Sequence, residues 1–148
     1  MKKSEIAKNY FSTTFNCSQS VLASFGKDYG LTEDLSLKIS CAFGGGMARQ
    51  QMTCGVVTGA LMAIGLAFGR GAGDPQANTL TTYDKTKEFF TEFRKRHGSI
   101  ICKELLQGLD MNNPEDKIKI DELKLFQNVC MKYVQDAVEI SERIINGD

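Results

Sequence analysis

An uncharged, largely apolar run of sixteen residues, Cys54 to Gly69, decides more about the fold of this chain than any other segment. A membrane-spanning helix needs about twenty such residues, so the run favours a helix buried in a protein core. Its Ala and Leu content favours a helix. Because apolar side chains lie on nearly all of its sides, we expect it to be the central helix of a bundle.

Capping residues and apolar periodicity divide the rest of the chain into further helices. Asn16 and Thr32 are candidate N-caps, and Gly98 is a candidate C-terminal stop. No segment alternates apolar and polar residues with period two, so we expect no sheet. The sequence therefore predicts one all-α domain over residues 1–148, a bundle of about six helices around the apolar one. The expected helices cover 4–12, 17–27, 33 to about 42, 54–68, 78–97 and 100–107, with one last long helix after Pro114.

The apolar stripes of these helices predict which side chains face the core. In the third helix the stripe places Leu35, Ile39 and Ala42 inward, with Cys41 on the same inner face. Two longer stripes are expected in the helix over 78–97 and in the last helix, and they consist of Tyr83, Phe89, Phe90 and Phe93, and of Leu123, Phe126, Cys130, Val134, Ala137 and Ser141.

The charge balance and the start of the chain narrow the class of function. Eighteen basic residues balance eighteen acidic ones, whereas a protein that neutralises phosphates usually has a basic excess. Nucleic acid is therefore not an expected partner. Lys2 and Lys3 are not followed by the apolar stretch that a secretory signal requires. We expect a soluble cytoplasmic protein without a transmembrane span, and its oligomeric state is left open.

Five cysteines carry the candidate function: Cys17, Cys41, Cys54, Cys102 and Cys130. In a reducing compartment they are not expected to be permanent disulfides. Three of them, Cys17, Cys54 and Cys102, fall where helices are predicted to begin. The unpaired N–H groups and partial positive charge of a helix N-terminus stabilise a thiolate. We therefore expect the pKa of Cys54, if this residue is partly exposed, to lie below the usual value of about 8.5.

The spacing of the cysteines excludes several known kinds of site and leaves three interpretations. There is no C-x-x-C, no C-x-x-C-H and no Cys/His tetrad, which argues against a thioredoxin-type site, a c-type haem and a zinc finger. A joint site must be assembled by folding, with thiols from several helices. The thiols then act in redox exchange, bind a metal, or pack in the core. Packing suits Cys41 and Cys130 best because each lies on an apolar stripe.

The glycine triplet at residues 44–46 and the single histidine, His97, are expected to have structural roles rather than to bind a ligand. Gly44-Gly45-Gly46 follows a helix and lacks the Gly-Lys-Ser/Thr ending of a phosphate-binding loop, so we expect a tight crossing next to Cys54. His97 follows three basic residues at a helix end, where cations are favourable. We expect it to be a surface residue rather than a ligand.

The cysteines stand in short motifs whose order along the chain is that of a known family: Asn16-Cys17-Ser18-Gln19-Ser20-Val21-Leu22, Phe43-Gly44-Gly45-Gly46-Met47, Cys54-Gly55-Val56-Val57-Thr58-Gly59-Ala60-Leu61-Met62, Cys102-Lys103-Glu104-Leu105-Leu106 and Cys130. The chain resembles the C_GCAxxG_C_C family of redox-active proteins, which have about this length, four characteristic cysteines and a CGAxxG motif. The resemblance covers nearly the whole chain. Val56 replaces the alanine of that motif, a small apolar change that affects packing rather than chemistry.

The resemblance implies that Cys17, Cys54, Cys102 and Cys130 form the site, whereas Cys41 is a local variation. We expect the four thiols to converge near one end of the apolar helix and to act as a thiol-dependent oxidoreductase with an unidentified redox partner. Cys54 would be the reactive thiolate, and one of the others would resolve it. One alternative is a metal or iron–sulfur module with the same four cysteines as ligands, and the other is a structural or partner-binding bundle.

Overall fold

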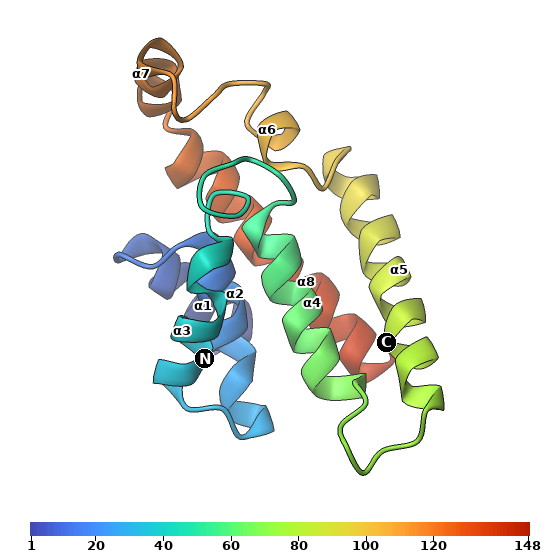
Figure 1. The fold of residues 1–148 in the computed structure, drawn as a ribbon. Coiled ribbons are helices and arrows are strands. Elements are labelled where there is room, and N and C mark those ends of the chain that lie inside the picture. Colours follow the sequence, from blue (N-terminus) through green and yellow to red (C-terminus); the bar gives the residue numbers. More distant parts are fainter.

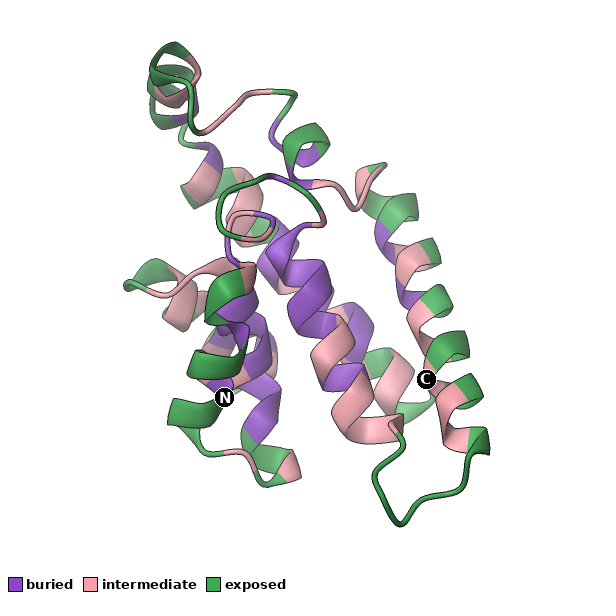
Figure 2. Ribbon diagram, viewed as in Figure 1, coloured by how far each residue is buried: buried purple, intermediate pink, exposed green.

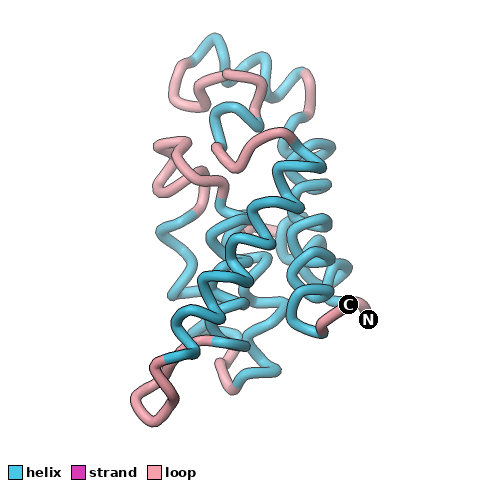
Figure 3. The backbone as a smooth tube through the Cα atoms, turned by 90° about the vertical axis from the view of Figure 1, so that its right-hand side faces the viewer, coloured by secondary structure: helices cyan, strands magenta, loops and turns pink.

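The computed structural model describes residues 1–148 and contains α-helices, short 3-10 and π turns, and no strand. Figure 1 shows α7 at one end of the molecule and both termini in the other half, and Figure 3 shows the same from the side. The all-α class is confirmed, but the eight α-helices exceed the expected six. They are α1 (Lys3–Ser12), α2 (Cys17–Gly26), α3 (Glu33–Ser40), α4 (Gly55–Phe68), α5 (Ala77–His97), α6 (Cys102–Leu105), α7 (Pro114–Glu122) and α8 (Met131–Asn146).

The helices α2 and α3 begin at the residues predicted as caps. The Asn16 side chain accepts a hydrogen bond from the Gln19 N–H at 3.0 Å, and the Gln19 side chain accepts one from the Asn16 N–H at 3.0 Å. This reciprocal pair is a capping box. Thr32 caps α3 by accepting from the Leu35 N–H at 3.1 Å. Both starts depend on local sequence alone, which is why they could be predicted.

The inward face of α3 differs from the predicted one. Leu35 and Ile39 are 48% and 50% exposed, whereas Ser36 and Ser40 are buried. The cause is the close approach of α3 to α2, because a Cβ on Gly26 would lie only 2.1 Å from the Ser36 hydroxyl oxygen. Only small side chains fit between the two helices.

The apolar run forms α4, and its first half is the buried part. Residues 55–60, Ala63 and Ile64 are buried, whereas the other residues of α4 are partly exposed. The helix packs against α2, α5 and α8, and Figure 2 shows its buried positions concentrated toward its start. Contact with α2 depends on Gly59, where a Cβ would lie 2.8 Å from the Ser18 backbone oxygen. None of the helices has the length and apolar character that crossing a membrane requires.

Two phenylalanines of α5 form part of the core. Phe89 and Phe93 are fully buried and stack with their ring centroids 5.6 Å apart. Tyr83, predicted on the same stripe, is 57% exposed. Six residues separate it from Phe89, and at about 100° per residue this spacing turns it to a different side of the helix. Gly98 ends α5 in the left-handed conformation, with a φ of 83°, as predicted.

The segment predicted as one last long helix is divided into α7 and α8. α7 ends at Glu122, Lys124 has a φ of 53°, and a π turn over Phe126–Cys130 precedes α8. This break shifts the helical register, and Leu123, predicted inward, is 55% exposed. Beyond the break the remaining positions of the stripe are buried as predicted: Val134, Ala137 and Ser141.

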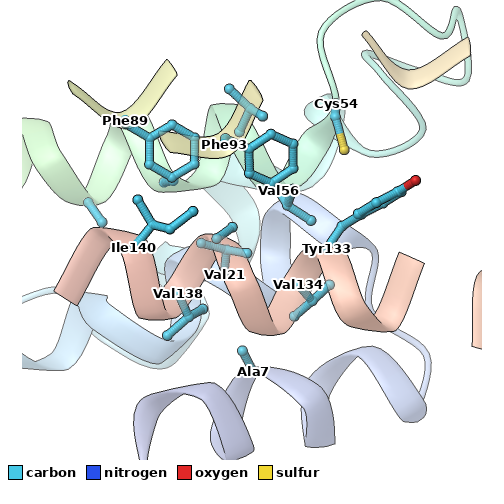
Figure 4. Close-up of a cluster of buried hydrophobic side chains, with 14 of the residues drawn as sticks. Ala7, Val21, Cys54, Val56, Phe89, Phe93, Tyr133, Val134, Val138 and Ile140 are labelled. Atoms are coloured by element: carbon cyan, nitrogen blue, oxygen red, sulfur yellow. The ribbon is translucent and has the colours of Figure 1, made fainter. Parts of the chain in front are cut away.

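Two apolar clusters make up the interior. The larger lies among α1, α2, α4, α5 and α8 (Figure 4), and the smaller joins α6 to α7 and to the segment before α8. Cys54 belongs to the larger cluster and Cys102 to the smaller, while Cys130 packs against both. Cys54, Cys102 and Cys130 therefore lie where the two clusters meet.

Candidate functional site

Each cysteine stands at or next to the end of a helical element, and all five are free thiols. Cys17 and Cys102 are the first residues of α2 and α6, and Cys54 is the N-cap residue of α4. These three positions at helix starts were predicted. Cys130 ends the π turn before α8, and Cys41 begins a 3-10 turn directly after α3.

All five cysteines line one cavity of about 740 Å³. Small-molecule sites typically have volumes of about 300–1,000 Å³. The four predicted site cysteines thus reach one cavity from four different elements, and Cys41 joins them. The other lining residues are mainly apolar, and they include Phe11, Val56, Leu106, Met111, Phe126, Met131 and Tyr133.

A short backbone bridge holds the segment before Cys54 against the segment before Cys102. Thr53 and Ile101 form an isolated antiparallel bridge. The N–H groups of Cys54 and Cys102 each donate to a carbonyl of the opposite segment, at 2.8 and 2.7 Å. The bridge therefore brings α6 to the start of α4. A single bridged pair is too short to produce a period-two pattern, so the sequence did not reveal it.

Glycines leave room for the thiols to approach the backbone of other elements. A Cβ on Gly55 would lie 2.3 Å from the Cys17 sulfur, so this sulfur rests against the residue that follows Cys54. A Cβ on Gly46 would lie 2.8 Å from the Cβ of Cys102. Gly46 and Gly55 therefore each leave room for a cysteine from elsewhere in the chain, whereas a Cβ on Gly44 or Gly45 would meet Asn16 or Arg49.

The loop from 44 to 53, which precedes Cys54, winds with left-handed backbone conformations and forms a ring near the start of α4 (Figure 1). Left-handed conformations cost a non-glycine residue roughly 1–2 kcal/mol, so this loop needs support from its surroundings. Gln51 supplies it: its side chain donates to the Leu109 carbonyl and accepts from the Met111 N–H, both at 2.8 Å. The tight crossing expected at the glycine triplet thus extends further, since the residues with φ between 53° and 71° are Gly45, Gly46, Met47, Ala48, Arg49 and Gln51.

Burial raises the pKa of the four thiols that the sequence predicted as site residues. It raises the pKa of Cys102 and of Cys130 to about 12, that of Cys17 above its ordinary value, and that of Cys54 well above it. The neighbouring charge of Cys17 raises the pKa of each of the other three further. The low pKa expected for a partly exposed Cys54 does not apply, because Cys54 is only 6% exposed and the loss of water outweighs the helix N-terminus.

Cys17 is the thiol with the most backbone donors around it. Burial is the larger influence and leaves its pKa raised, but N–H groups of Gly45, Ser18, Gly55 and Cys17 itself act to lower it. A concavity of backbone N–H groups favours an anion. At Cys54 only the N–H of Val56 acts in this way. Of these two thiols, Cys17 is therefore better equipped than Cys54 to carry a thiolate.

Cys41 is exposed, and the buried position predicted for it is wrong. It follows the last turn of α3, whose inward face is made of serines rather than of the predicted apolar stripe. Its carbonyl accepts a hydrogen bond from the Asn16 side-chain amide at 3.0 Å, and Asn16 directly precedes Cys17. The fifth thiol thus lies beside the start of α2.

A family model described as "Putative redox-active protein (C_GCAxxG_C_C)" matches residues 15–144 of the 148. The chain belongs to the C_GCAxxG_C_C family. The resemblance noted in the sequence is confirmed, and the matched range includes all four cysteines assigned to the family pattern. Neither a curated protein nor a solved structure matches the chain.

Tyr133 also lines the cavity of this C_GCAxxG_C_C family member, and the sequence analysis did not identify it. The Tyr133 hydroxyl donates to the Leu105 carbonyl at 2.8 Å. Its pKa is raised to about 12, first by burial and then by the nearby thiols of Cys130, Cys54 and Cys102. Figure 4 shows the Tyr133 ring and the Cys54 sulfur at the same end of the buried cluster. Its position one helical turn after Cys130 was the available signal, since residues three apart share a helix face.

His97 is not the surface residue that was expected. Its Nε2 lies 2.9 Å from a carboxylate oxygen of Asp136, a residue only 2% exposed, and its ring packs against Phe93 and Tyr133. Burial lowers the pKa of His97 although Asp136 acts to raise it. The hydrogen bond between His97 and Asp136 connects the end of α5 to α8, next to the Tyr133 ring.

The thiols of this family member have the donor chemistry for a soft metal or an iron–sulfur cluster. However, no group of three or more His, Cys, Asp and Glu side chains is arranged to hold a metal ion. The metal interpretation, with Cys17, Cys54, Cys102 and Cys130 as ligands, stays a prediction.

Proposed function

We propose that this member of the C_GCAxxG_C_C family is a thiol–disulfide oxidoreductase in which Cys17 and Cys54 are the exchanging pair. The observation that carries the proposal is the convergence of five free thiols on one cavity. Cysteines that only pack behave as small apolar residues and have no reason to gather around one space. Convergence is the arrangement that exchange between thiols requires.

One contact and two influences on the thiol pKa values favour Cys17 and Cys54 as the pair. The Cys17 sulfur rests against Gly55, the residue after Cys54. After burial, the charge of Cys17 is the strongest influence on the pKa of Cys54. The backbone donors around Cys17 favour its thiolate. We therefore assign the attacking role to Cys17 and the resolving role to Cys54, the reverse of the roles expected from the sequence.

The proposed reaction consumes one disulfide of a partner. The Cys17 thiol loses its proton and attacks one partner sulfur, the partner S–S bond breaks, and one partner thiol leaves with a proton. The Cys54 thiol then loses its proton and attacks the Cys17 sulfur, which releases the second partner thiol and leaves a Cys17–Cys54 disulfide. Two protein thiols are oxidised and one partner disulfide is reduced. Cys102 and Cys130 are further thiols to which the disulfide can pass.

The burial of the pair favours the reducing direction. A dithiol becomes a strong oxidant when its reduced form is stabilised, as happens when one thiol has a strongly lowered pKa. Here burial raises both pKa values. We expect a potential nearer the thioredoxin value of about −270 mV than the value of about −120 mV typical of strong oxidants. Such a couple suits the reducing cytoplasm, where we place the protein.

Peptide mapping after mild oxidation tests the proposal. Reduced protein, purified without air, is oxidised with a small disulfide and trapped by alkylation. We expect a Cys17–Cys54 disulfide that a reductant reverses, and its loss in Cys17→Ser and Cys54→Ser. The control Met131→Leu changes a cavity-lining sulfur that cannot exchange, and such volume-conserving changes cost little. Stoichiometric metal bound to the purified protein, or thiols that resist oxidation while folded, would contradict the proposal.

A further inference from the structure

The cavity opens to solvent along a rim of six exposed lining residues: Ser12, Thr13, Cys41, Ala48, Arg49 and Gln127. This rim carries one thiol, Cys41, and one charge, Arg49. The other four thiols are buried or half-buried. A molecule that enters the cavity therefore meets a rim that includes Cys41 and Arg49.

Arg49 is the only charged residue among those that line the cavity. It takes part in none of the ion pairs of the structure. Its backbone is nonetheless fixed, because its N–H donates to the Gly44 carbonyl at 3.2 Å and its carbonyl accepts from the Asn112 side chain at 2.8 Å. A guanidinium without a carboxylate partner at the mouth of a cavity is suited to bind an anion, and its planar donors match a carboxylate.

Cys41 is the thiol best placed for the first contact with a substrate. It is exposed, whereas burial raises the pKa of each of the other four thiols and so reduces the thiolate present at neutral pH. The hydrogen bond from the Asn16 amide to its carbonyl fixes its backbone beside the start of α2. Cys17 is the next residue after Asn16, so the exposed thiol and the proposed exchanging pair adjoin one another.

We propose that the rim is a docking site for an anionic low-molecular-weight disulfide, whose carboxylate Arg49 binds and whose sulfur Cys41 attacks first. The inference rests on the proposed thiol–disulfide function and adds the class of substrate. A small molecule is indicated because the cavity of about 740 Å³ falls within the range of small-molecule sites.

The proposed sequence has three steps. The Cys41 thiol loses its proton and attacks the substrate, whose S–S bond breaks so that one half leaves as a thiol. Cys17 attacks the Cys41 sulfur, and the second half leaves as a thiol. Cys54 then attacks the Cys17 sulfur, and Cys41 recovers its proton as a thiol. The net result is the same as before, one substrate disulfide reduced and a Cys17–Cys54 disulfide formed, but Cys41 accelerates it.

Oxidation rates with three probes of different charge test both residues. The probes are 3,3′-dithiodipropionate, which is dianionic, 2-hydroxyethyl disulfide, which is neutral, and cystamine, which is dicationic. At low salt the dianion should oxidise the wild type about tenfold faster than the dication, or more, and added salt should reduce this difference in rate. Arg49→Gln should remove the preference. The control Arg70→Gln changes an exposed arginine beyond the opposite end of α4 and should keep it.

Cys41→Ser should slow oxidation by all three probes by a similar factor, about tenfold, while the Cys17–Cys54 disulfide still forms at the end. An unchanged charge preference in Arg49→Gln would overturn the role of Arg49, and unchanged rates in Cys41→Ser would overturn that of Cys41. The two proposals fail differently: if no probe yields the Cys17–Cys54 disulfide, the function itself is wrong, whereas its formation at rates independent of charge and of Cys41 contradicts only the docking site.

Discussion

Cys17 and Cys54 share a cavity, yet their sulfurs have different surroundings. Both lose water on folding, which raises both pKa values, but only Cys17 lies within several backbone N–H groups. Exclusion of water keeps the thiols protonated, and the donors ease the removal of one proton when exchange begins. At the level of single residues, the site therefore combines thiols that stay protonated at neutral pH with one thiol whose proton is more easily removed.

The raised thiol pKa values predict that the reduced protein loses stability in alkali. Unfolded thiols titrate with a pKa near 8.5, whereas burial raises the pKa of folded Cys102 and of folded Cys130 to about 12. Above pH 9 the unfolded state binds fewer protons than the folded one, so the free energy of unfolding should fall, by up to about 1.4 kcal/mol per pH unit for each such thiol.

Urea unfolding of reduced protein between pH 7 and pH 10 measures this fall. Unfolded tyrosines also begin to titrate toward pH 10, so comparison with a cysteine variant assigns the fall to the thiols. Cys102→Ser should make the decrease shallower, and Met131→Leu, which removes no titrating group, should leave it as in the wild type. A decrease of equal steepness in all three proteins would show that the buried thiols do not cause it.

At the level of elements, the site depends on how closely α2 approaches α4. The two helices meet at Gly55 and Gly59, where a Cβ would lie 2.3 Å from the Cys17 sulfur and 2.8 Å from the Ser18 oxygen. The two glycines are one turn apart on α4, so they form a strip without side chains on which the first turn of α2 rests. The spacing of the family motif is thus a packing requirement of two helices.

Gly55→Ala should destabilise the protein and impair the exchange, because the new methyl group has no space beside the Cys17 sulfur. We expect a loss of about 1–3 kcal/mol in the free energy of unfolding, the usual cost of overpacking, and slower formation of the Cys17–Cys54 disulfide. Gly65→Ala is the matched control in the same helix, since nothing lies within 4 Å of its added Cβ. It should stabilise the helix by up to about 1 kcal/mol. Equal effects of the two changes would refute the packing argument.

At the level of the whole molecule, the cavity lies at the junction of two apolar clusters. The larger cluster fixes α4, α5 and α8, and the smaller holds α6 and α7. The bridge between Thr53 and Ile101 joins the two parts beside the thiols. The walls of the cavity therefore depend on core packing at a distance from the sulfurs.

Phe93→Ala should lower the free energy of unfolding by about 3–5 kcal/mol, because Phe93 is fully buried between α5 and α8. Tyr83→Ala, on the same helix, should change it by less than about 0.5 kcal/mol, since Tyr83 is 57% exposed. Chemical denaturation measures both. If the two variants lost similar free energy of unfolding, Tyr83 would face the core as the sequence pattern predicted.

Features that depend on neighbouring residues could be predicted from the sequence, and those that depend on distant ones could not. The caps Asn16 and Thr32 and the stop at Gly98 act within one helical turn. The exposure of Leu35 depends on how closely α3 meets α2, and that of Cys41 on where α3 ends. The cysteines assigned from the family pattern reach one cavity, but their raised pKa values follow from burial, which local sequence does not specify.

The bridge between Thr53 and Ile101 joins parts of the chain that are far apart in sequence, and this has a consequence for biosynthesis. Contacts between distant residues close large loops, and chains rich in them fold slowly. Until α6 has reached α4, the five thiols belong to an open chain in which any of them can pair with any other. A wrong pair formed at that time would lock out the native cavity. A newly made chain therefore has to stay reduced until it has folded, so a reducing environment of the kind that suits the proposed reaction would also protect its assembly.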